Sequence, residues 1–269
     1  MTILDKIIFH YHRPKLNLFK TLIFNFKTLP LSLAFKLPVF LYGKVDFYFL
    51  RGSVEFQNCI VKRGMVKMGN NIEYLGAVKG ASLFVLYPNS KIIFEGSCRF
   101  SNDFFIRTGE NAILRIGHDT FFGSGTKLVC IYRITIGKST QLAYNSQILD
   151  SDFHYIHNLN TNEISPREKE VHIGAFNWIG NNSTINKGTI TEDYTIVASN
   201  SLLNKNYKAT YESFDVLAGQ PAKRISSRQK RIFSLKKEED LIAYFRENYS
   251  SIAVNLSLNE IVNSIIKND

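Results

Sequence analysis

The chain has 269 residues, enough for one large domain or two small ones, and its 45% hydrophobic and 21% charged residues are typical of a globular protein. The three cysteines are far apart in sequence, which argues against a disulfide framework or a zinc ribbon and fits a reducing compartment. The 21 Phe and 13 Tyr residues favour β-rich packing over a helical bundle.

Residues 1–53 carry much of the net charge of +10 and are predicted to form a basic, apolar N-terminal cap. No apolar run reaches the roughly 18 residues of a membrane-spanning helix, and charged residues interrupt the start, so we expect no signal peptide. Contact with an anionic membrane surface is a second interpretation of this segment. Nucleic-acid binding is not expected, because no recognised motif accompanies the charge.

Residues 54–225 contain a repeat of six residues, regular from Ile116 onward. Since a strand alternates faces every two residues, each hexad would place one side chain inward, and three hexads would close one triangular coil. A glycine or alanine often follows the inward residue, where the backbone turns. Helices are not expected, because the glycines would break them and the apolar spacing is not 3.6. The inward positions are Ile116, Phe122, Leu128, Ile136, Leu142, Ile148, Ile173, Ile179, Ile185, Thr191, Val197 and Leu203.

The segments on either side of the regular hexads differ from them. Residues 54–113 alternate apolar and polar side chains between turns such as Pro88-Asn89 and Gly109-Glu110, which predicts wider and less regular coils. Residues 226–269 are predicted to form a helical tail. Its first helix, "SLKKEEDLIAYFRENY", would be capped by Ser234, and "SLNEIVNSIIKN" would form a second.

The hexads resemble those of the hexapeptide-repeat acyltransferases. The resemblance covers about residues 85–225, and "LAGQPAKRI" is similar to the closing AGxPAK motif of that family. The segments "DSDFH" and "FNFKTLPLSLAFKLPVFLYG" are similar to members that O-acetylate bacterial surface polysaccharides. The resemblance implies a mainly β fold, a left-handed parallel β-helix with an N-terminal cap and a C-terminal helical tail. It also implies a homotrimer with three active sites. The widely spaced cysteines and the expected lack of a signal peptide favour a cytoplasmic location, at the inner face of the membrane under the second interpretation above.

A polar loop over residues 150–172 interrupts the hexads and carries the candidate catalytic residues. Acetyl transfer to a hydroxyl needs a base, and histidine suits that role because its pKa lies near working pH. His154 is the candidate base, and Asp152, preferred over Asp150, would hold its imidazole. "DFH" resembles the Asp-x-His motif of the family, which implies direct transfer. No Gly-x-Ser-x-Gly motif or neighbouring cysteine supports a covalent route.

The other candidate residues would bind the acceptor and the acetyl-CoA donor. Asn145, Tyr155 and His157 are candidates for the acceptor sugar. Trp178, expected in place of a polar turn residue, would pack on the donor or at the subunit seam. Lys223 and Arg224 are candidates for the phosphates of coenzyme A. Small side chains would let the extended pantetheine chain of coenzyme A lie along the β-helix. The small residues at the family's positions are Gly180, Ala198, Ser199, Ala218 and Gly219.

Three alternatives remain open from the sequence. In the first, the acceptor is the amino group of a nucleotide-linked sugar, which would make the chain an N-acetyltransferase. A γ-type carbonic anhydrase would bind zinc with histidines of adjacent subunits, and the candidates here are His118, His154, His157 and His172. His154 and His157 are three residues apart inside a loop rather than one coil apart, so no metal is expected. A non-catalytic β-helix assembly protein is the third, although it would have no need for both the loop and the coenzyme A motif.

Overall fold

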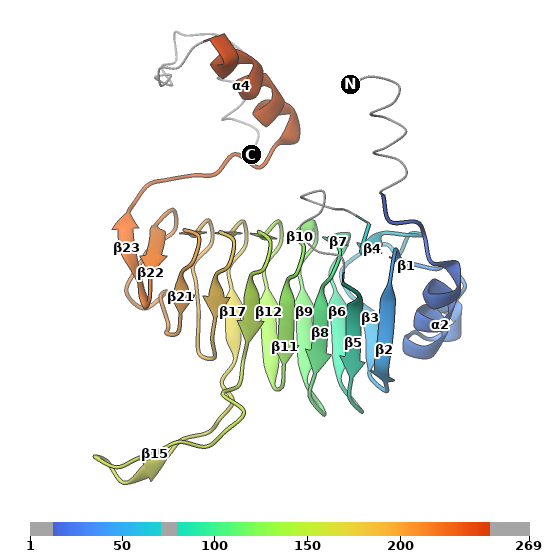
Figure 1. Ribbon diagram of the computed structural model, residues 1–269, viewed down its shortest axis with the longest axis horizontal. Helices are drawn as coiled ribbons and strands as arrows, with labels where there is room; N and C mark the ends of the chain where they lie inside the picture. The colour runs from blue at the N-terminus through green and yellow to red at the C-terminus, as the bar shows by residue number, and fades with distance from the viewer. Residues whose placement is uncertain (1–12, 71–79, 248–269) are drawn as a thin grey trace. The chain divides into compact units, whose positions relative to one another are not determined.

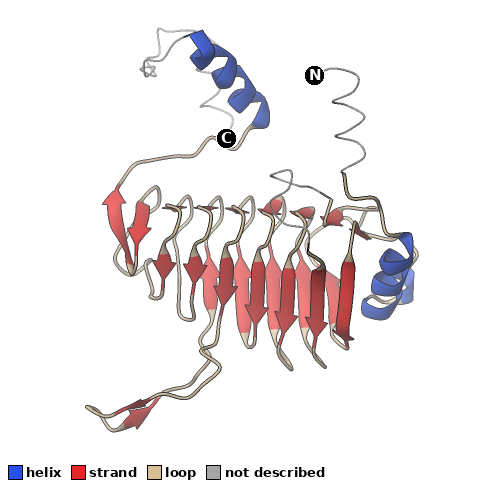
Figure 2. Ribbon diagram, viewed as in Figure 1, coloured by secondary structure: helices blue, strands red, loops and turns tan. Residues whose placement is uncertain are grey.

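The computed structural model describes residues 13–70 and 80–247. The chain divides into two compact units, which meet in sequence at Gln229 and Lys230. Three long sheets make up the first unit, and a two-stranded hairpin projects from them (Figure 1). The second unit is helical in its described part (Figure 2).

The strands of the three sheets run in the following order. The nine-stranded sheet contains β1 (Val39–Leu41), β4 (Val66–Met68), β7 (Cys98–Phe100), β10 (Thr120–Phe122), β13 (Gln141–Leu142), β18 (Trp178–Ile179), β20 (Ile196–Val197), β22 (Val216–Gly219) and β23 (Ala222–Ser226). The seven-stranded sheet contains β2 (Val45–Leu50), β5 (Ser82–Leu86), β8 (Phe105–Thr108), β11 (Lys127–Cys130), β14 (Gln147–Leu149), β19 (Thr184–Ile185) and β21 (Leu202–Leu203). The five-stranded sheet contains β3 (Ser53–Phe56), β6 (Lys91–Phe94), β9 (Ile113–Ile116), β12 (Arg133–Ile136) and β17 (Val171–Ile173).

The chain visits the three sheets in turn, so that three successive strands make one coil. Each strand pairs in parallel with the strand of the next coil, as Phe121 does with Gln141 and Gln141 with Trp178. Among the described strands of these sheets, only β22 and β23 pair antiparallel, at the last coil. The predicted left-handed parallel β-helix is therefore confirmed.

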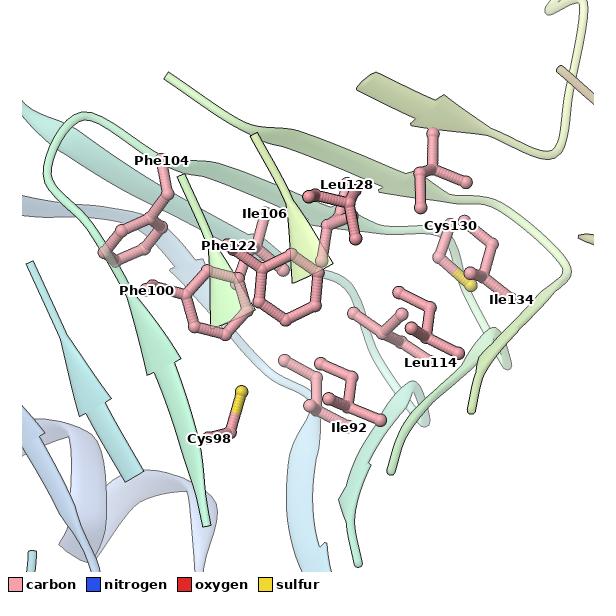
Figure 3. Close-up of a cluster of buried hydrophobic side chains, with 14 of the residues drawn as sticks. Ile92, Cys98, Phe100, Phe104, Ile106, Leu114, Phe122, Leu128, Cys130 and Ile134 are labelled. Atoms are coloured by element: carbon pink, nitrogen blue, oxygen red, sulfur yellow. The ribbon is translucent and has the colours of Figure 1, made fainter. Parts of the chain in front are cut away.

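The inward position of every predicted hexad is buried. All twelve side chains, from Ile116 to Leu203, are at most 2% exposed. Earlier coils fill the same column with aromatic rings, and Phe100 stacks on Phe122 with ring centroids 4.1 Å apart (Figure 3). Burying one such side chain contributes about 1.5–3 kcal/mol, so the continuous column is the main source of stability in this unit.

The small residues after the inward positions allow the coils to approach one another. A Cβ on Gly137 would lie 2.5 Å from the backbone nitrogen of Ala175 in the next coil. A larger residue there would force the two coils apart. The predicted role of glycine at these corners is therefore confirmed.

The β-helix begins earlier than the predicted residue 54. Strand β1 pairs with β4 and strand β2 with β5, so the first coil starts at Val39. This coil lacks regular hexads because β2 is longer than the later strands and has a register shift between Phe47 and Phe49. The N-terminal cap is correspondingly shorter than residues 1–53.

Two helices close the N-terminal end of the β-helix. Helix α2 (Leu18–Thr28) begins at Asn17, whose side chain accepts a hydrogen bond of 3.1 Å from the backbone of Lys20. The short helix α3 (Leu31–Ala34) follows it. None of the described helices has the length and apolar character needed to cross a bilayer.

The second unit contains helix α4 (Leu235–Glu247). The side chain of Ser234 accepts a hydrogen bond of 3.5 Å from the backbone of Lys237, which agrees with its predicted place as the cap. The second helix predicted for the tail lies outside the described residues.

Candidate active site

The predicted loop is an arm that projects from the β-helix between β14 and β17. Its tip is an antiparallel hairpin of β15 (His157–Asn158) and β16 (Glu163–Ile164), visible at the bottom of Figure 1. At its base the outgoing and returning limbs are joined by backbone hydrogen bonds from Asp152 to Arg167 (2.9 Å) and from Lys169 to Asp150 (2.9 Å). The arm is therefore an ordered extension of the coil.

His154 lies on the outgoing limb of the arm and is exposed. The preceding residue, Phe153, has a φ of 64°, and its backbone nitrogen donates a 3.0 Å hydrogen bond to the Ser151 hydroxyl. This turn directs the chain away from the coil just before the imidazole. Asp150 and Asp152 were predicted to hold the imidazole of His154. In the described chain their carboxylates instead contact other residues.

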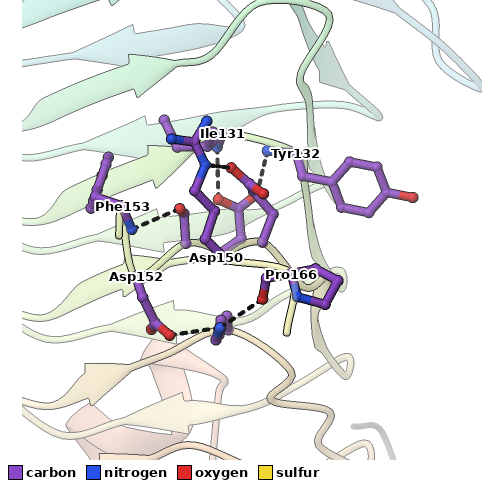
Figure 4. A network of polar contacts seen from close by, with 10 residues as sticks. Ile131, Tyr132, Asp150, Asp152, Phe153 and Pro166 are labelled. Carbon is purple, nitrogen blue, oxygen red and sulfur yellow. Dashed lines mark hydrogen bonds and ion pairs between the residues drawn. The ribbon is translucent and has the colours of Figure 1, made fainter. Parts of the chain in front are cut away.

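Asp152 forms an ion pair with Lys187, a residue that was not predicted for the site. The Nζ atom of Lys187 lies 2.6 Å from the Asp152 carboxylate and also donates a 3.0 Å hydrogen bond to the carbonyl of Pro166 (Figure 4). Lys187 thus ties both limbs of the arm to the next coil. No sequence signal singled it out, because its position becomes informative only once the arm has been placed.

Asp150 is fully buried beneath the base of the arm. Its two carboxylate oxygens accept hydrogen bonds from the backbone nitrogens of Ile131 (2.7 Å) and Tyr132 (2.8 Å) (Figure 4). Burial raises the pKa of this carboxyl, and the amide hydrogen bonds only partly offset that rise. These contacts give Asp150 a structural role at the corner of the preceding coil.

Arg107 is a second residue near the arm that was not predicted for the site. It lies on β8 in register with Val129 of β11, which is in turn in register with Leu149, the last residue of β14 before the arm. Its guanidinium lies 5.8 Å from the ring centroid of Tyr87 and 5.6 Å from that of Phe153. Its Nε atom is buried and has no hydrogen-bond partner in the described part of the chain. This arginine is therefore held by aromatic rings beside the arm, with hydrogen-bonding capacity left over.

The predicted acceptor residues lie in different places. Tyr155 and His157 are both exposed on the arm, and Nε2 of His157 lies 2.9 Å from the side-chain oxygen of Asn162. Asn145 is an exposed corner residue with a φ of 57°, just before β14, whereas the arm leaves after β14. Within one chain, Asn145 and the arm are thus at opposite ends of the same strand.

The small residues predicted to bind acetyl-CoA follow one another along the last strands of the nine-stranded sheet. Gly180 follows β18, Ala198 and Ser199 follow β20, and Ala218 and Gly219 end β22. Hydrogen bonds of 2.7 Å from Gly180 to Val197 and of 2.8 Å from Ala198 to Leu217 hold these corners together. Ala198 and Ala218 are half-buried and Ser199 is exposed, whereas Gly180 is buried. Their assignment to coenzyme A stays a prediction.

The larger residues predicted to bind acetyl-CoA flank this row. Trp178 lies within β18 and not in the predicted turn, and the residue is 39% exposed. Lys223 and Arg224 are exposed on β23. The Arg224 guanidinium lies 3.5 Å from Asp215 and 5.6 Å from the ring centroid of Tyr211, so its position is already fixed.

The histidines of the zinc alternative do not converge in one chain. His118 lies in a coil corner and His172 on β17, whereas His154 and His157 lie on the arm. Over residues 13–70 and 80–247, no group of three or more His, Cys, Asp or Glu side chains is arranged to hold a metal ion.

The chain is similar in sequence to the polysialic acid O-acetyltransferase of Neisseria meningitidis. The two are 28% identical over 140 residues, which cover 44% of this chain and 65% of the relative. The match thus spans less than two thirds of the relative. No protein-family model matches the chain. The resemblance to polysaccharide O-acetyltransferases indicated by the sequence is confirmed by this relative.

Several solved structures overlap with this one. They include the polySia-specific acetyltransferase NeuO (TM-score 0.41, 16% identity, 78% of this chain and 91% of that one) and the polysialic acid O-acetyltransferase OatWY (TM-score 0.38, 20% identity, 75% and 95%). A mutant of AntD, an N-acyltransferase from Bacillus cereus solved with dTDP and coenzyme A, overlaps with a TM-score of 0.43 at 15% identity over 78% and 88% of the two chains.

Proposed function

We propose that this protein is an acetyl-CoA-dependent O-acetyltransferase that acts on a sugar hydroxyl of a bacterial surface polysaccharide or its precursor. The observation that carries the proposal is the arm: a β-helix coil opens at Asp150, presents an exposed His154, and closes again into regular hexads. The sequence similarity to a polysialic acid O-acetyltransferase supports the same activity.

In the proposed reaction, His154 accepts the proton of the sugar hydroxyl as the hydroxyl oxygen attacks the thioester carbonyl. The carbon–sulfur bond then breaks, and the imidazolium returns the proton to the departing sulfur. Acetyl-CoA supplies the acyl group and a thiolate leaving group. The row of small residues from Gly180 to Gly219 would hold the extended pantetheine chain of acetyl-CoA. Lys223 and Arg224 would lie beside the phosphates of the coenzyme. Asp152, paired with Lys187 in a single chain, would fix the limb that carries His154.

We include a homotrimer in this proposal because the arm exposes large apolar side chains. Contiguous exposed apolar surface on a folded protein marks an interaction site. A neighbouring copy would cover the arm and place His154 against the neighbour's coils. The exposed side chains and their exposed fractions are Phe153 (36%), Tyr155 (67%), Ile156 (64%), Leu159 (83%) and Ile164 (65%).

The acceptor in this proposal carries a negative charge. Arg107 lies between Tyr87 and Phe153 without a carboxylate partner in the described residues, and Phe153 directly precedes His154. A guanidinium whose stem is packed by aromatic rings is suited to bind a carboxylate or phosphate. The net charge of +10 favours the approach of an anionic polymer.

The test is release of coenzyme A thiol from acetyl-CoA in the presence of acidic glycans, neutral glycans and nucleotide-linked amino sugars, with product masses. We expect O-acetylation of acidic glycans. Transfer only to an amino group would favour the N-acetyltransferase alternative. Absence of transfer would favour an assembly protein, and stoichiometric zinc in the purified protein would favour the carbonic anhydrase alternative.

Replacing Arg107 with methionine is expected to raise KM for an acidic acceptor by about tenfold or more, because one charge-assisted hydrogen bond contributes about 1.5–3 kcal/mol. The KM for acetyl-CoA should stay unchanged. Arg99→Met is the matched control, since Arg99 also contacts a ring, that of Phe121, but on the nine-stranded sheet. Equal KM changes in the two variants would remove Arg107 from the acceptor site.

A further inference from the structure

Helix α2 packs with an unusual orientation: most of its buried side chains are polar and its exposed side chains are largely apolar. The residues facing the β-helix are Thr21, Phe24, Asn25 and Thr28. On the other side, the exposed fraction reaches 57% for Leu18 and 69% for Phe19. An ordinary surface helix would bury the apolar side.

The buried polar side chains explain why the helix cannot rotate. Strand β1 is the first of its sheet and would otherwise expose unpaired backbone groups at its outer edge. The Thr21 hydroxyl accepts a 3.0 Å hydrogen bond from Leu41. Asn25 donates to the carbonyl of Val39 at 2.7 Å and accepts from its nitrogen at 3.2 Å. The helix thus closes the edge of the β-helix with polar groups, which fixes its apolar side outward.

The apolar side chains of the two helices form one surface. Phe26 on α2 contacts Phe35, just after α3, edge to face with ring centroids 5.1 Å apart. We call the set the end face, and helix α2, which carries four of its members, lies at the N-terminal end of the stack (Figure 1). Its members and their exposed fractions are Leu18 (57%), Phe19 (69%), Leu22 (38%), Phe26 (38%), Leu31 (65%) and Phe35 (74%).

The segment that carries the end face has charged residues of a single sign. Residues 6–45 contain seven Lys and Arg residues and no Asp or Glu. Lys15, Lys27 and Lys36 are exposed and have no ion pair in the described part of the chain. Lys20, by contrast, approaches Asp46 at 3.9 Å and lies over the ring of Phe47. An apolar centre with a lysine border is complementary to acyl chains beneath anionic headgroups.

We propose that the end face binds the surface of an anionic lipid bilayer. A protein partner fits less well, because lysine is depleted at protein interfaces. Bilayer binding at this end leaves the arm free for its acceptor, because the arm follows β14, the fifth strand of its sheet, whereas α2 packs on β1, the first strand of its own. The proposal does not depend on the acetyl transfer proposed above.

The test is co-sedimentation of the full-length protein with vesicles. We expect binding to phosphatidylglycerol mixed with phosphatidylcholine, little binding to phosphatidylcholine alone, and loss of binding at high salt. Phe19→Ser should weaken binding about tenfold through lost apolar insertion. Ile225→Ser is the matched control, because Ile225 is 65% exposed on β23 at the other end of the sheet and should not change binding.

A charge variant keeps the test decisive if Phe19→Ser does not fold. Lys27→Glu combined with Lys36→Glu should weaken binding about tenfold or more, because each lysine contributes attraction to an anionic surface. Failure of the unaltered protein to bind anionic vesicles would overturn the proposal. A smaller oligomer for Phe19→Ser in light scattering, with vesicle binding unchanged, would also overturn it and would assign the end face to a second copy of the chain.

Discussion

Replacing His154 with alanine is expected to lower the turnover of acetyl transfer at least about a hundredfold, the usual contribution of a general base. The imidazole is exposed on the arm and has no structural contact in the described chain that the substitution would remove. Stability, oligomeric state and affinity for coenzyme A should therefore stay unchanged. The measurement is thiol release at saturating acetyl-CoA, with melting temperature and coenzyme A binding recorded on the same preparations.

The matched control for this prediction is His118→Ala. His118 is also exposed, but it lies in the corner between β9 and β10. It should retain normal turnover. If His154→Ala keeps near-normal turnover as well, His154 is not the base and the acid–base chemistry must lie elsewhere. A parallel loss in both variants would point to damage to the fold.

The regular coils could be predicted because their sequence period records a geometric constraint. Every inward hexad position from Ile116 to Leu203 faces the same narrow column, and only aliphatic, aromatic or threonine side chains occupy it. The first coil could not be predicted in the same way. Its strand β2 is six residues long and contains a register shift, so no fixed period marks the inward positions. The predicted start at residue 54 was wrong for this reason.

The position of the candidate site in the chain could be predicted from the sequence, but the contacts of its individual residues could not. The interruption between Ile148 and Val171 marks the arm, because a coil cannot absorb that many extra residues. Asp150 and Asp152 are the same residue type two positions apart, and only burial separates them: one lies under the coil and the other pairs with Lys187. Arg107 has no sequence signal either, because the rings of Tyr87 and Phe153 that contact its guanidinium belong to other coils.

Replacing Asp150 with alanine is expected to destabilise the β-helix by about 2–6 kcal/mol, since two backbone N–H groups would lose their acceptor and each such loss costs about 1–3 kcal/mol. For a protein of this size the melting temperature should fall by roughly 10 °C. The corner at Ile131 and Tyr132 supports the base of the arm, so turnover should fall with stability. Thermal unfolding followed by circular dichroism gives the stability change.

Two further variants separate this structural role from the catalytic alternative. Asp152→Ala removes only the partly exposed ion pair with Lys187 and should cost at most about 1 kcal/mol. Asp150→Asn keeps the size and one acceptor oxygen, but its amide group would face a backbone N–H that also needs an acceptor. It should therefore lose stability as well. If Asp150→Asn instead melts like the unaltered protein while turnover falls about a thousandfold or more, Asp150 orients the catalytic imidazole and its structural assignment is wrong.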